Sequence, residues 1–123
     1  MAEKRKILFI DDNPVDRALI SSLLTKYDFQ VILAVDGNIG LKMAQEDKPD
    51  LILLDILLPH ISGIELCKKM KQDPAIQDIP IVFYTSLDTP KDLINYASYG
   101  AQDYIPKTLP PEELIAEINS ILK

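Results

Sequence analysis

The sequence predicts an α/β fold in which a five-stranded parallel sheet carries helices on both faces. Five short apolar runs recur at fairly even spacing, and they are continuous rather than alternating, as in strands buried on both sides. The runs are ILFI (7–10), VILAV (31–35), LILLD (51–55), IVFYT (81–85) and DYI (103–105). Segments with helical periodicity separate them, so the pattern is (βα)5 with right-handed crossovers.

Start signals mark the predicted helices. Asn-Pro at 13–14 and Thr-Pro at 89–90 place a capping side chain before a proline at the first helical position. Ser62 with Glu65 three residues later is typical of a capping box. The segment PPEE (110–113) puts proline and negative charge in a first turn, where both are favoured.

Apolar residues recur with helical periodicity between the runs. In the first such segment, Val15, Leu19 and Leu23 recur every four residues. In the last helix one face collects five apolar residues: Leu114, Ile115, Ile118, Ile121 and Leu122.

Composition limits the class of protein. A chain of 123 residues fits one domain, 1–123. The net charge of −6 gives no reason to expect nucleic acid or an anionic membrane as a direct partner. Cys67 is the single cysteine, which excludes an internal disulfide and suits a reducing compartment. Because no apolar stretch approaches the roughly 20 residues of a membrane helix, we expect a soluble, cytoplasmic domain.

Polar residues gather where the predicted strands end. A common order for five such strands is 2-1-3-4-5, which places a ligand-binding switch point between strands 1 and 3. Strand 1 ends in Asp11 and Asp12, strand 3 in Asp55, strand 4 in Thr85, and strand 5 runs on to Lys107.

These acids predict a cation. Two carboxylates about 4 Å apart repel by roughly 4 kcal/mol at an effective dielectric near 20. An all-oxygen site of few carboxylates suits Mg²⁺. Taken alone, Asp11 and Asp12 before Asn-Pro also fit a turn and helix cap. Asp55 is harder to explain structurally, since it is a lone carboxylate in an apolar run.

Four segments with these residues make the chain resemble the receiver domain of two-component response regulators over essentially its whole length. They are IDDN (10–13), LILLDILLPHISGIEL (51–66), IPIVFYTS (79–86) and GAQDYIPK (100–107). The resemblance implies a flavodoxin-like (βα)5 fold. It also implies that Asp55 takes a phosphoryl group from a phosphohistidine on a histidine kinase or a histidine phosphotransfer protein, as a carboxylate nucleophile can.

The resemblance assigns roles to the remaining residues. Mg²⁺ would be held by Asp12, Asp55 and the backbone carbonyl of Leu57, with Asp11 reaching it through water. Lys107 would pair with phosphate oxygens. The Thr85 hydroxyl would hydrogen-bond one of them and move on phosphorylation.

Tyr104 would then turn inward and repack the surface of helix 4, strand 5 and helix 5, which a downstream target protein reads. Such a domain catalyses only its own phosphorylation and dephosphorylation, so it is not a conventional enzyme.

One position departs from the family pattern, and two others bear on how long the phosphoryl group lasts. The family lysine usually precedes a proline in a cis peptide bond, whereas here Thr108 follows Lys107. We predict that the Lys107–Thr108 bond is nonetheless cis, at a cost of about 3–4 kcal/mol. Leu57 and Leu87, where the family tunes water access, are both apolar. We therefore expect the phosphorylated form to hydrolyse slowly.

Two other functions remain open at this point. An aspartyl-phosphate phosphohydrolase would use similar groups, but it carries its nucleophile in an Asp-x-Asp after strand 1, and Leu57 leaves no general acid here. A phosphorylation-independent interaction domain would not need the intact acids. Because the chain ends with its last predicted helix, we expect a stand-alone receiver, as a monomer or a weak dimer.

Overall fold

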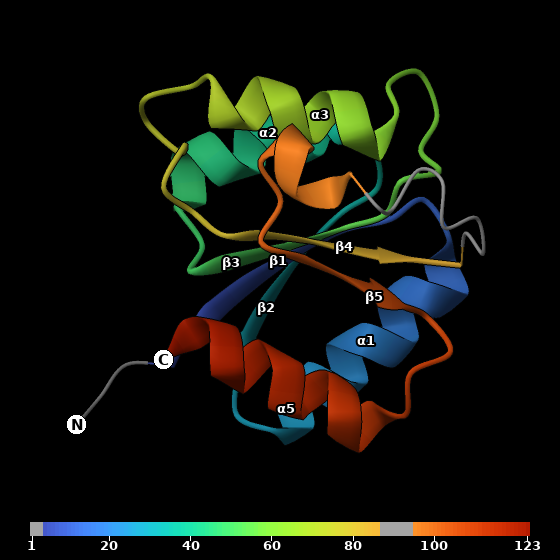
Figure 1. Ribbon diagram of the computed structural model, residues 1–123. Coiled ribbons are helices and arrows are strands. Elements are labelled where there is room, and N and C mark those ends of the chain that lie inside the picture. The colour runs from blue at the N-terminus through green and yellow to red at the C-terminus, as the bar shows by residue number, and fades with distance from the viewer. Residues whose placement is uncertain (1–3, 87–94) are drawn as a thin grey trace.

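The structure is a computed structural model that describes residues 4–86 and 95–123. Its centre is a parallel five-stranded sheet in the order β2-β1-β3-β4-β5, which confirms the predicted fold class and strand order (Figure 1). Each strand lies within two residues of its predicted run. The strands are β1 (Lys6–Ile10), β2 (Gln30–Ala34), β3 (Leu51–Leu54), β4 (Ile81–Thr85) and β5 (Asp103–Pro106).

Helices cover both faces of the sheet, as predicted. α2 (Gly37–Asp47) and α3 (Gly63–Lys71) lie on one face, while α1 (Pro14–Lys26) and α5 (Pro111–Leu122) lie on the other (Figure 1). A short 3-10 helix, η1 (Tyr96–Tyr99), precedes β5. The helix start expected at Thr-Pro 89–90 lies outside the described residues. No helix within residues 4–86 and 95–123 combines the length and apolar character that crossing a membrane requires.

The helix caps follow the sequence signals. The Asn13 side chain accepts hydrogen bonds from the first-turn amides of α1, 2.8 Å from Val15 N. Ser62 accepts from Glu65 N at 3.2 Å at the start of α3. These bonds satisfy amides that have no partner within the helix. The caps therefore fix the starts of α1 at Pro14 and of α3 at Gly63.

The strands divide the core into two layers because successive side chains point to opposite faces of a sheet. In β1, Ile7 and Phe9 join the layer under α1 and α5, whereas Leu8 and Ile10 join the layer under α2 and α3. All four are 0% exposed. This double burial explains why the strand runs are continuously apolar.

The buried face of α1 is not the row of Val15, Leu19 and Leu23. Val15 and Leu19 are both 63% exposed, and the buried residues of α1 are Ile20 and Leu24. Leu23, the third residue of the row, is half-buried and packs against the core. Because both rows are apolar and have the same four-residue spacing, periodicity alone could not choose between them.

Gly63, the first residue of α3, lies directly against the backbone of the loop that follows β3. Its amide donates to the Ile56 carbonyl at 2.8 Å. A β-carbon at this position would overlap the Asp55 carbonyl oxygen and lie 2.7 Å from the Ile56 α-carbon. The absence of a side chain therefore lets α3 start close enough to fix the backbone of Asp55.

The buried face of α1 can be tested by truncation. Leu24→Ala removes a fully buried side chain and is expected to lower the free energy of unfolding by about 3 kcal/mol. Leu19→Ala removes an exposed one and should cost less than about 1 kcal/mol. Urea unfolding of both variants provides the comparison, and equal losses would contradict this assignment of the buried face.

Gly63→Ala tests the close approach of α3. We expect a loss of at least about 2 kcal/mol in unfolding free energy, because the new methyl group meets backbone rather than a flexible side chain. Gly37→Ala is the matched control. Its β-carbon would meet the Ile61 side chain at 2.6 Å, which can move, so it should cost less than Gly63→Ala.

Candidate functional site

The site forms where β1 and β3 end side by side. Ile10 and Leu54 are partners in the parallel register, so Asp11 and Asp55 leave the sheet at neighbouring positions. The Asp55 amide donates to the Ile10 carbonyl at 3.1 Å. After β1 the chain turns to α1 on one face, and after β3 it turns to α3 on the other (Figure 1). This divergence is the switch point at which ligands bind in such sheets.

Three carboxylates meet at this edge. Asp11, Asp12 and Asp55 each offer an oxygen, and these atoms all lie within 4.8 Å of one another. Asp11 is 0% and Asp55 4% exposed, whereas Asp12 faces solvent. The structure therefore brings the three predicted acids together from two separate parts of the chain.

Lys107 reaches into this cluster from the end of β5. Its Nζ lies 2.6 Å from Asp11 Oδ2 and 3.1 Å from Asp55 Oδ2. Its amide donates to the Thr85 carbonyl at 2.9 Å, which ties the end of β5 to the end of β4. Only 14% of the Lys107 side chain is exposed. The lysine is thus held by backbone at one end and by carboxylates at the other.

A third carboxylate on Lys107 was missed by sequence reasoning. Asp16 Oδ2 lies 2.7 Å from Lys107 Nζ, closer than Asp55 does. Asp16 sits in the first turn of α1, where an acid is expected simply from the helix dipole. The position of Asp16 in the sequence could have indicated this contact. Because α1 begins close to the carboxyl end of β1, the first turn of α1 lies at the same site.

The protonation equilibria follow from burial and pairing. Burial raises the pKa of Asp11 above its ordinary value, against the lowering effects of hydrogen bonds from Lys107 and the Asn13 amide. Burial alone would lower the pKa of Lys107, but hydrogen bonds to Asp11 and Asp16 and the charge of Asp55 outweigh it and raise the pKa. Lys107 is therefore a permanent cation at neutral pH.

The remaining predicted site residues occupy the rim and the neighbouring strands. Thr85, at the end of β4, is fully buried. The Leu57 side chain is 55% exposed, and its amide lies 3.3 Å from Asp55 Oδ1. Tyr104 is 37% exposed, and its ring packs 5.5 Å from that of Tyr96. Leu87 lies outside the described residues.

The prediction of a cis Lys107–Thr108 bond is wrong. The described residues contain no cis peptide bond, yet Lys107 still points at Asp55. A trans bond suffices here because the amide of Lys107 is anchored on Thr85 and its long side chain covers the remaining distance to the acids. Without proline at 108, the trans form is also favoured by several kcal/mol.

The acids suit a hard divalent cation. Carboxylate oxygens from three residues lie within reach of one point, and one of these residues faces solvent, which leaves room for water ligands. The donor set therefore fits a divalent cation such as Mg²⁺.

Comparison with known proteins points the same way. The sequence model of the family described as response regulator receiver domain matches residues 7–119. Protein PilH of Pseudomonas aeruginosa is 32% identical over 117 residues, covering 95% of this chain and 97% of PilH. The response regulator PleD of Caulobacter vibrioides is 36% identical over 118 residues, covering 96% of this chain but only 26% of PleD.

Other relatives are also longer than this chain. The chain spans 49% of PhoP, the alkaline phosphatase synthesis transcriptional regulatory protein of Bacillus subtilis, with 38% identity over 119 residues. It therefore corresponds to a quarter to a half of several relatives it matches, and to nearly all of PilH.

Solved structures share the whole fold. The activated N-terminal receiver domain of Klebsiella pneumoniae RstA superposes with a TM-score of 0.91 at 38% identity, covering 97% of this chain and 99% of that one. Chemotaxis protein CheY4 of Vibrio cholerae gives 0.88 at 26% identity, covering 95% and 98%. The chain belongs to the receiver domain family of two-component response regulators.

Proposed function

We propose that Asp55 is the phosphoacceptor of a two-component phosphorelay. A carboxylate oxygen of Asp55 attacks the phosphorus of a phosphohistidine on a histidine kinase or phosphotransfer protein. The new O–P bond forms as the P–N bond to the imidazole breaks, and the imidazole nitrogen keeps the electron pair and takes up a proton. The supporting observation is the meeting of Asp55, its two neighbouring acids and Lys107 at one strand edge.

The residues divide the work of positioning and charge neutralisation, which dominate phosphoryl transfer. Lys107 neutralises negative charge on the arriving oxygens, and the buried Thr85 hydroxyl donates to one of them. Asp12, Asp55 and the Leu57 carbonyl would hold Mg²⁺, with Asp11 contributing through water. When bound, that ion lowers the repulsion between the acids and the phosphoryl oxygens.

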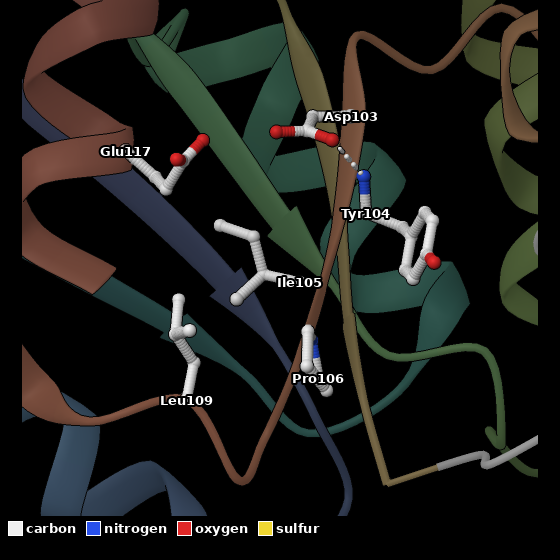
Figure 2. Close-up of a pocket in the computed structure, with 6 residues that line it drawn as sticks. All are labelled: Asp103, Tyr104, Ile105, Pro106, Leu109 and Glu117. Carbon is white, nitrogen blue, oxygen red and sulfur yellow. Dashed lines mark hydrogen bonds between the residues drawn. The ribbon is translucent and has the colours of Figure 1, made fainter. Parts of the chain in front are cut away.

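The proposed output surface lies at β5 and α5. Figure 2 shows Tyr104 and Ile105 pointing to opposite sides of β5, with Ile105 and Leu109 on the side of Glu117 of α5. Tyr104 lies on the other side of β5, where its side chain is partly exposed. Its backbone is paired with Phe83 of β4. We infer that a shift of Thr85 toward the phosphoryl group lets Tyr104 turn inward and changes this surface for a target protein.

The domain then serves as a signalling module rather than a conventional enzyme. Its charge disfavours nucleic acid as a direct partner, and its reduced, buried cysteine suits the cytoplasm. In the unphosphorylated state we expect a monomer or a weak dimer.

A small phosphodonor tests the assignment of Asp55. Incubation with acetyl phosphate and Mg²⁺ should add one phosphoryl group, seen as a mass increase in intact-protein mass spectrometry. The adduct should be lost in Asp55→Asn and after removal of Mg²⁺ with a chelator. Asp50→Asn, which changes an acid at the opposite end of β3, is the control and should still be labelled.

Other outcomes identify the alternatives. Rapid turnover of phosphate esters would point to a phosphohydrolase, and a wild-type protein that forms no adduct would point to an interaction domain.

The lifetime of the phosphoryl adduct tests whether the apolar residues Leu57 and Leu87 slow its hydrolysis. Neither Leu57 nor Leu87 can orient a water molecule, so we expect slow decay in the wild type. The Leu57→Asn/Leu87→Glu double variant should decay about tenfold faster or more, which is below the roughly 10²- to 10⁴-fold that a fully positioned general base contributes. Phosphate release after removal of the donor measures both rates, and equal or slower decay in the variant would contradict the expectation.

A further inference from the structure

Lys107 has no donor to spare in this structure. An ammonium group carries three N–H donors. Three carboxylate oxygens lie within 2.6 to 3.1 Å of its nitrogen, one each from Asp11, Asp16 and Asp55. An anion that is to bind Lys107 must therefore displace one of these three partners.

Asp16 differs from the other two acids in its surroundings. It comes from the first turn of α1 rather than from a strand end, and its side chain is 29% exposed. The carboxylate group whose oxygens lie within 4.8 Å of one another comprises Asp11, Asp12 and Asp55 and does not include Asp16. A cation shared by that group would weaken the hold of Asp11 and Asp55 on Lys107 and leave the charge of Asp16 undiminished.

We propose that Asp16 is a positioning residue. Its carboxylate pairs with the Lys107 ammonium and competes with the phosphoryl group for it. Asp16 keeps Lys107 paired until the incoming oxygens offer a stronger negative charge, and it thereby limits how far the domain is phosphorylated by weak donors. This inference rests on the proposed phosphoacceptor function of Asp55.

The first measurement needs neither metal nor phosphate. In metal-free protein, the Lys107 ammonium should give a slowly exchanging ¹⁵N–¹H signal, because all three protons are bonded to carboxylates. Asp16→Asn should speed its exchange about three- to tenfold, and Asp16→Glu should restore slow exchange. Exchange that is unchanged in Asp16→Asn would overturn the pairing on which the proposal depends.

The second measurement uses beryllofluoride, which mimics a phosphoryl group, at Mg²⁺ concentrations that saturate each variant. Asp16→Asn should bind it about three- to tenfold more tightly than the wild type, as expected from removing one partly exposed charge-assisted hydrogen bond. Glu112→Gln removes an equivalent first-turn acid from α5 and should bind like the wild type. Unchanged or weaker binding by Asp16→Asn would overturn the proposal.

A double-mutant cycle separates the action through Lys107 from a general effect of charge. In the Lys107→Ala background, the gain from Asp16→Asn should shrink to less than about half, since only like-charge repulsion remains. An equal gain in both backgrounds would show that Asp16 does not act through Lys107. Failure of the wild type to bind beryllofluoride would instead overturn the proposed function itself.

Discussion

The pairing of Lys107 with three carboxylates is the interaction on which this site depends. Asp11 and Asp55 are almost completely buried, and two carboxylates about 4 Å apart repel by roughly 4 kcal/mol at an effective dielectric near 20. Burial adds a desolvation cost for each charge unless a partner is present. Lys107 supplies that partner from a position 52 residues beyond Asp55 and 96 beyond Asp11. The ammonium therefore links the ends of β1, β3 and β5 with the start of α1, and the site can form only when these strands and β4 between them are assembled.

The sheet delivers these groups through backbone contacts rather than through the side chains themselves. The amide of Asp55 donates a hydrogen bond to the carbonyl of Ile10, and the amide of Lys107 donates one to the carbonyl of Thr85. The backbone position of each residue is therefore fixed by the strand beside it. Gly63 then brings α3 against the Asp55 backbone, where a β-carbon would collide with the carbonyl oxygen. Because Asp55 and Lys107 lie on or next to fixed backbone, little conformational freedom would be lost if a phosphodonor binds there as proposed.

The fold was predictable because its strands are buried on both faces and are therefore continuously apolar, a pattern that surface residues do not obscure. Asp55 was predictable for the same reason, since a lone carboxylate that ends an apolar run has few structural explanations. Asp11 and Asp12 also fitted a turn and helix cap, and they became candidates only in combination with the other strand ends. Three features follow only from the packing in three dimensions. In α1, two apolar rows compete, and only packing shows that Ile20 and Leu24 face the core. The trans bond at Lys107 depends on how far a long side chain reaches. Asp16 looks like an ordinary first-turn acid until Lys107 is placed beside it.

The same geometry offers a route from the proposed phosphorylation site to the surface. Lys107 can satisfy three acceptors, so a phosphoryl group on Asp55 would change the sharing of its donors among the acids. The Lys107 amide donates to the Thr85 carbonyl, and Thr85 ends the strand in which Phe83 is paired with Tyr104. A displacement of Lys107 and Thr85 would thus act on the β4–β5 pair at the residues that support Tyr104, whose ring packs against that of Tyr96. Because β5 is an edge strand and Tyr104 is partly exposed, we expect this surface to change while the two core layers keep their packing.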